Sequence, residues 1–142
     1  MGRDIWEHSP TARQIFFDAD HYRRTNISEL CFFGPEEKLL PTVNSQLAVF
    51  VTSLAYAEAK KELIPESKSP DFLAGHSVGL IAAMTFGGVV NFHCALDIVA
   101  ERGRLMAEAC RQNHGRMVAL IEPNIKEIAL LMEKYRLGGN FN

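Results

Sequence analysis

Apolar residues recur every three to four positions along much of this chain, which is the spacing of one face of an α-helix. The pattern predicts helices over residues 10–22, 42–64, 92–111 and 125–137, with a further helical turn over 27–32. Two of these helices have a typical start. Ser9 stands directly before Pro10 at the beginning of the first helix, and Asn91 stands at the expected N-cap of the third.

Shorter apolar runs have the length and composition of β-strands. Residues 71–76 contain the run Phe72-Leu73-Ala74, residues 117–121 are Met-Val-Ala-Leu-Ile, and residues 140–142 are suited to begin another strand. Residues 78–85 follow the first run almost at once and are apolar and alanine-rich. We therefore expect them to form a helix that is buried nearly all round.

The turn between that strand and that helix carries the most informative motif, Gly75-His76-Ser77-Val78-Gly79. A serine between two glycines at a strand-to-helix turn is the nucleophile-elbow pattern, which presents the Ser77 hydroxyl for attack on an acyl group. We expect both glycines to be required because a side chain at either position would crowd the tight turn. The N–H of Val78, at the start of the helix, is the expected donor to an oxyanion. The motif predicts acyl-transfer chemistry.

Composition and charge exclude several other classes of function. The 142 residues are 47% hydrophobic and 23% charged, which is typical of a soluble globular protein with one core. The formal net charge is −2 with no basic run, so the sequence does not predict nucleic-acid binding. No apolar stretch reaches membrane-spanning length and no signal pattern is present, so we expect no membrane association and a cytoplasmic location. The three cysteines form no Cys-x-x-Cys pair, and we expect buried thiols.

Several separate stretches resemble the malonyl-CoA:acyl carrier protein transacylase family, which includes the acyltransferase domains of fatty acid and polyketide synthases. The Gly-His-Ser-x-Gly motif is the family's form of the elbow. Residues 101–106, Glu-Arg-Gly-Arg-Leu-Met, are similar to the family's Arg-Gly-Arg-Leu-Met helix, and Arg102 follows Ser77 by the family's spacing of 25 positions. Residues 30–37 and 42–46 resemble the segment that leads into the family's Thr-x-x-x-Gln helix.

The resemblance implies a fold class and its division. It implies an α/β fold: an α/β-hydrolase-like large subdomain with a parallel sheet and the elbow over residues 1–115, then the beginning of a small ferredoxin-like subdomain over residues 116–142. It also implies an incomplete copy, which lacks the family's N-terminal strand and glutamine loop and the later part that holds its catalytic histidine. Unpaired sheet edges in such a fragment predict self-association or binding of a complementing segment.

The resemblance further implies a role for each residue of the site. Ser77 attacks the thioester carbonyl of malonyl-CoA, and the phosphopantetheine thiol of an acyl carrier protein then resolves the acyl-serine ester. Arg102 binds the malonyl carboxylate through its planar guanidinium, and Gln46 lines the substrate site from the long helix. His76 lies beside that site in a packing role, since neighbouring side chains on a tight turn point apart. Coenzyme A enters as part of a substrate, and no bound cofactor or metal is expected.

The residues themselves leave alternatives open. An acyl hydrolase would use the same elbow and pass the acyl group to water, but it needs no carboxylate-binding arginine. A catalytically inactive, truncated or complementing fragment would keep the pattern without the chemistry. Taken without the resemblance, Arg102 belongs with Glu101 and Arg104 to a solvated charged helix face. Leu80 stands where the family commonly has glutamate, so the preferred acyl group stays open, as does the choice between fatty acid and polyketide synthesis.

Overall fold

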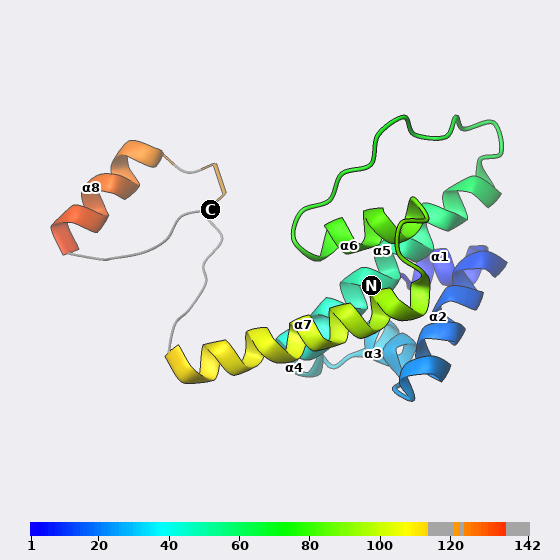
Figure 1. Ribbon diagram of the computed structural model, residues 1–142, viewed down its shortest axis with the longest axis horizontal. Coiled ribbons are helices and arrows are strands. Elements are labelled where there is room, and N and C mark those ends of the chain that lie inside the picture. Colours follow the sequence, from blue (N-terminus) through cyan, green and yellow to red (C-terminus); the bar gives the residue numbers. More distant parts are fainter. Residues whose placement is uncertain (114–120, 123, 136–142) are drawn as a thin grey trace.

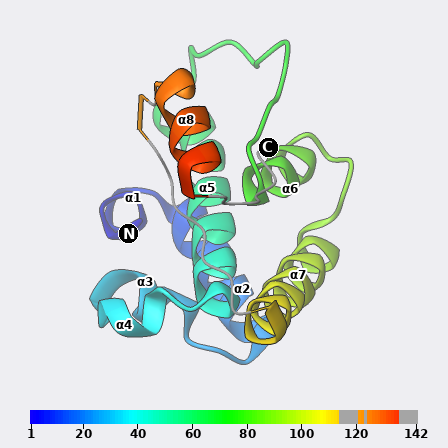
Figure 2. The same ribbon diagram turned by 90° about the vertical axis from the view of Figure 1, so that its left-hand side faces the viewer.

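The computed structural model describes residues 1–113, 121–122 and 124–135, and these residues form helices joined by loops (Figure 1). The helices are α1 Arg3–His8, α2 Pro10–Arg23, α3 Ile27–Phe33, α4 Glu36–Leu39, α5 Thr42–Leu63, α6 Val78–Phe86, α7 Phe92–Asn113 and α8 Ile125–Tyr135. Helix α5 lies in the middle and packs against α2, α6 and α7, and less extensively against α1, α3 and α4 (Figures 1 and 2). It is therefore the scaffold on which helices α1 to α4, α6 and α7 are placed.

The core is built around α5, whose buried residues are mainly alanines and larger apolar side chains. The buried residues of α5 are Leu47, Ala48, Phe50, Val51, Thr52, Leu54, Ala55 and Ala59. Helix α2 contributes Phe16 between two buried alanines, and α7 contributes Leu96 and Val99. Small side chains allow the helices to approach closely, and the larger ones fill the space between them.

The helices predicted from periodicity are confirmed wherever the structure describes them. The Ser9 hydroxyl accepts a hydrogen bond from the N–H of Ala12 at 3.0 Å, and Asn91 Oδ1 accepts from the N–H of Cys94 at 2.9 Å. Both expected N-caps are thus present. The expected end of the last helix lies outside the described residues. Helices α1 and α4 were not predicted, because four to six residues are too few to show a helical period.

The expected parallel sheet is wrong for the residues that the structure describes, none of which lies in a strand. The run over residues 71–76 instead belongs to a loop between α5 and α6, which arcs away from the helices and then returns to the start of α6 (Figures 1 and 2). Phe72 is 92% exposed. A strand depends on hydrogen bonds to a neighbouring strand, and the described residues supply no such partner. Of the strand expected at 117–121, residues 117–120 lie outside the described residues and Ile121 is not in a strand; the strand expected at 140–142 lies outside them entirely.

The expected burial of the helix after the elbow is also wrong. In α6 only Val78 and Ala82 are buried, and Leu80 is 52% exposed. The helix packs on α5 and α7 with one side, and no described element covers the opposite side. The apolar composition of α6 therefore exceeds what this part of the chain buries.

The division of the chain at residue 116 remains a prediction. Of the second part, the structure describes α8 and a few residues before it, and no residue of α8 is buried. Throughout the described ranges, no helix combines the length and the apolar character that crossing a membrane requires.

Candidate active site

The elbow forms a sharp turn with Ser77 at its tip. Ser77 has φ 57° and ψ −120° and directly precedes α6. The helix begins at once, since the N–H of Gly79 donates to the carbonyl of His76 at 2.9 Å and that of Leu80 to the carbonyl of Ser77 at 3.2 Å. A positive φ is uncommon for a residue with a side chain, and such conformations concentrate at functional sites. The backbone of the elbow is therefore present without the expected strand before it.

The two glycines of the motif play different parts. A Cβ atom on Gly75 would lie 2.1 Å from the carbonyl carbon and oxygen of Gly79 and 2.4 Å from the nitrogen of Leu80. The expected crowding is confirmed at this position. A Cβ atom on Gly79 would meet nothing within 4 Å, so the same expectation is wrong there. Only Gly75 is required by the packing of the turn in the described residues.

Helices α5 and α7 approach each other closely near the elbow because α7 carries a glycine at the contact. Gly103 is buried, and a Cβ atom there would lie 3.1 Å from both the Thr42 carbonyl oxygen and the Val43 Cα. This contact brings the residue before it, Arg102, over Gln46 near the start of α5. Gly103 was not among the predicted site residues, although a glycine inside a helical pattern is a signal of close packing.

Arg102 connects Gln46 with the nucleophile. Its Nη2 donates a hydrogen bond to Ser77 Oγ at 2.9 Å, and its Nη1 donates to Gln46 Oε1. Its neighbours behave differently, because Arg104 forms an exposed ion pair with Glu101 at 2.8 Å. The structure therefore separates Arg102 from the solvated charged face formed by the other two residues. Three of the predicted site residues, from three different elements, lie together.

The remaining predicted site residues also lie at the elbow. The N–H of Val78 has no acceptor among the described residues, as expected for the first position of a helix. It is free to donate to an oxyanion. The side chain of His76 is exposed and forms no hydrogen bond or ion pair with the described residues. The hydrogen-bond partner of Ser77 Oγ in this part of the chain is Arg102 rather than a histidine.

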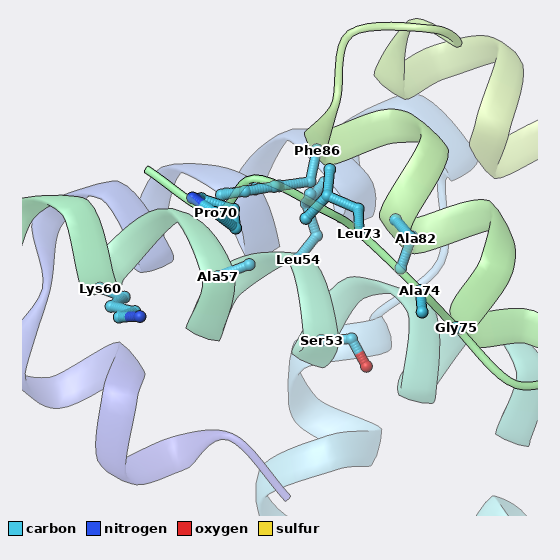
Figure 3. A pocket seen from close by; sticks show the side chains of 12 residues that line it. Ser53, Leu54, Ala57, Lys60, Pro70, Leu73, Ala74, Gly75, Ala82 and Phe86 are labelled. Atoms are coloured by element: carbon cyan, nitrogen blue, oxygen red, sulfur yellow. The ribbon is translucent and has the colours of Figure 1, made fainter. Parts of the chain in front are cut away.

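A largely apolar cavity of about 370 Å³ lies behind the elbow (Figure 3). Leu54 of α5, Leu73 of the loop and Phe86 of α6 come together within it, and Lys60 lies at one end (Figure 3). Gly75 and Gly79 line it, but Ser77 and Arg102 do not. The cavity is therefore separated from the nucleophile by the backbone of the turn.

The cysteines and acidic residues show no metal site in the part of the chain that is described. Within it, no group of three or more His, Cys, Asp or Glu side chains is placed to hold a metal ion. Cys31 is buried, and this burial raises the pKa of its thiol. The expectation of buried thiols is wrong for Cys94 and Cys110, which are exposed near the beginning and end of α7. All three cysteines are free thiols.

Comparisons with known proteins agree on one kind of protein. The chain is 35% identical to the malonyl CoA-acyl carrier protein transacylase of Bacillus subtilis (strain 168) over 140 residues, which are 99% of this chain and 43% of that protein. A transacylase structure of the same name from Coxiella burnetii matches with a TM-score of 0.78 at 27% identity, over 97% of this chain and 43% of that one.

A further match is a structure of a type II PKS acyl-carrier protein in complex with its malonyl-transacylase. Its TM-score is 0.71 at 34% identity, over 77% of this chain and 35% of the matched chain. No family model matches the sequence. The chain spans less than half the length of the Bacillus subtilis transacylase and of both matched structures.

Proposed function

Because the chain belongs to the malonyl CoA-acyl carrier protein transacylase family, we propose that it forms the nucleophile-bearing part of an enzyme that moves a malonyl group from coenzyme A to an acyl carrier protein. The observation that carries the proposal is the hydrogen bond of 2.9 Å between Arg102 Nη2 and Ser77 Oγ. It supports the proposal because a guanidinium, which can bind a carboxylate, then lies beside the oxygen that would attack the acyl carbon. A malonyl group has its carboxylate two bonds from that carbon, so one residue can bind it while the other reacts.

The first half-reaction that we propose uses the residues of the elbow. Ser77 Oγ attacks the thioester carbonyl, the N–H of Val78 donates to the developing oxyanion, and the carbon–sulfur bond breaks to release coenzyme A as its thiol. The second half-reaction reverses this order with the phosphopantetheine thiol of the carrier protein as the acceptor. A serine hydroxyl requires a general base, and no described histidine contacts Ser77. We propose that the base comes from the part of a transacylase that this chain does not span.

Arg102 accounts for the choice of a malonyl group. The guanidinium offers a planar pair of donors that matches a carboxylate, and simple acyl groups have no such acceptor. The helix packing at Gly103 and the hydrogen bond to Gln46 hold the guanidinium at the elbow. This arrangement favours malonyl transfer over simple acyl hydrolysis, which has no use for the carboxylate contact.

The test is the intact mass of the protein after incubation with malonyl-CoA. We expect a malonyl adduct, accumulating slowly with this chain alone and faster when it is completed with the parts of a transacylase that it does not span. The Ser77→Ala variant should form no adduct. Absence of the adduct from the completed protein would refute the proposal.

A selectivity measurement tests the carboxylate contact separately. In the completed protein, Arg102→Ala should lower kcat/KM for malonyl-CoA by about thirty- to hundred-fold, equivalent to about 2–3 kcal/mol for a charge-assisted hydrogen-bonded pair. Use of acetyl-CoA should not fall, because acetyl has no carboxylate. Arg102→Lys should restore only part of the loss, since an ammonium keeps the charge without the planar fork. An equal loss with both donors would instead indicate a structural role.

We further propose that the chain associates with another polypeptide and acts in the cytoplasm. The exposed run that contains Phe72 supports the association, because the described residues leave the side chain of Phe72 almost uncovered and pair no strand with the backbone of the run. The free thiols support a reducing compartment. Fatty acid and polyketide synthesis both remain compatible with the site.

A further inference from the structure

The guanidinium of Arg102 is engaged by the nucleophile itself. Of its two terminal nitrogens, Nη1 donates to Gln46 Oε1 and Nη2 donates to Ser77 Oγ at 2.9 Å. A carboxylate that binds in the bidentate manner needs two donors from the same guanidinium. These two contacts use two of the five N–H donors of the guanidinium. A carboxylate that binds on the side of Ser77 competes with the hydroxyl for Nη2.

We propose that Arg102 restrains the Ser77 hydroxyl until the carboxylate of an acyl donor displaces it, so that recognition of the carboxylate releases the nucleophile. This inference rests on the proposed function of the same site. Ser77 is the partner that yields, because its side chain is exposed whereas Gln46 is half-buried at the contact between α5 and α7. A carboxylate is also a stronger acceptor for a guanidinium than a neutral hydroxyl is.

The physical basis is the use of the oxygen lone pairs. Ser77 Oγ accepts a hydrogen bond from a charged donor, which withdraws electron density from the oxygen and fixes one of its two lone pairs, so the bond lowers its reactivity toward an acyl carbon. An acyl donor without a carboxylate has no group that can take the place of the Ser77 hydroxyl as the hydrogen-bond acceptor of Arg102. The positive charge has an opposing effect, since it stabilises the serine alkoxide. The two effects predict opposite changes when Arg102 is removed, so an experiment can separate them.

The first experiment measures acetylation of Ser77 in this chain by p-nitrophenyl acetate, which carries no carboxylate and no coenzyme A. The serine oxygen bonds to the acetyl carbon, the bond to p-nitrophenolate breaks, and the hydroxyl proton passes to the buffer base. The readout is the acetylated fraction of the peptide that contains Ser77. We expect Arg102→Ala to raise the rate by about three- to ten-fold, which is less than a buried charge-assisted hydrogen bond would give, because the site is exposed.

Arg104→Ala is the matched control, because Arg104 lies on the same helix, carries the same charge and pairs with Glu101 rather than Ser77. Its acetylation rate should equal that of the unaltered chain. Urea unfolding of each variant shows whether its fold is retained. A lower or unchanged rate for Arg102→Ala overturns the proposal.

The second experiment uses the unaltered chain and adds formate, which supplies the missing carboxylate as a separate molecule. Formate should raise the rate of Ser77 acetylation by a factor similar to that of the Arg102→Ala change, relative to chloride at the same ionic strength. It should have no effect on the Arg102→Ala variant. Inhibition by formate, no effect of formate, or no acetylation of Ser77 under any of these conditions overturns the proposal. Neither experiment uses malonyl-CoA, so failure here is distinct from failure to form a malonyl adduct.

Discussion

The two glycines of the elbow offer a paired test of how the turn is built. Gly75→Ala would place a methyl group 2.1 Å from the carbonyl carbon and oxygen of Gly79, whereas Gly79→Ala would place one in open space. The two substitutions are chemically identical and lie four residues apart in the same turn. A difference between them larger than the helix preference of alanine at Gly79 therefore reports the local packing.

The magnitude follows from the contact distances. Carbon atoms in contact are ordinarily about 3.5–4.0 Å apart, so the turn must move by more than an ångström to accept a side chain at Gly75. The atoms in the way are backbone atoms, which cannot rotate aside as a flexible side chain can. Overpacking of this kind costs about 1–3 kcal/mol. Gly79→Ala should instead be neutral or stabilise by up to about 1 kcal/mol, because alanine favours the helix that begins there.

Urea unfolding followed by circular dichroism measures the two free energies of unfolding. We expect the Gly75→Ala variant to unfold at a lower urea concentration than the unaltered chain and the Gly79→Ala variant at the same or a higher one. The first change should also slow acylation of Ser77, since movement at Gly79 displaces the N–H of Val78. Equal stability of the two variants would refute the assignment of Gly75 as the position where backbone segments meet.

Other predictions concern acidic residues, thiols and the exposed run. A hydrogen bond from the hydroxyl of Ser9 lowers the pKa of Glu62 from its ordinary 4.5. The stability that this hydrogen bond contributes is therefore present above pH 4.5 and is lost as the pH falls below it. In urea unfolding, the Glu62→Gln variant should lose less stability on acidification than the unaltered chain. Thiol reagents should modify Cys94 in the native chain but Cys31 only after unfolding, so rapid labelling of Cys31 would contradict its burial. Phe72→Ser should reduce self-association measured by sedimentation, and an unchanged molar mass would exclude the exposed run as the contact.

The sequence could predict the helices well because a helix is closed by local hydrogen bonds. Each N–H bonds to a carbonyl four residues earlier, so periodicity and end residues carry most of the necessary information. The start of α2 at Ser9 and the start of α7 at Asn91 were predicted for this reason. The elbow motif likewise identified Ser77, because the turn is made within five consecutive residues.

The errors share a different physical cause. The run at Phe72 has the composition of a strand, but a strand needs a partner that can be distant in the sequence, and none lies among the described residues. Leu80 is a large apolar residue of the kind that is usually buried, but its burial depends on an element that would cover α6. Composition indicates whether a segment is suited to burial or to strand pairing. Only the tertiary structure shows whether a neighbouring segment buries it or pairs with it.

By itself, the sequence determined the positions of the main helices, the nucleophile motif and the spacing between Ser77 and Arg102. Only the tertiary structure decided that Arg102 contacts both Ser77 and Gln46, which lie 25 and 56 positions away. That contact depends on how closely α7 approaches α5 at Gly103, where the lack of a side chain lets the two backbones meet. Packing between distant segments is set by the shapes of both surfaces, and neither segment specifies it alone.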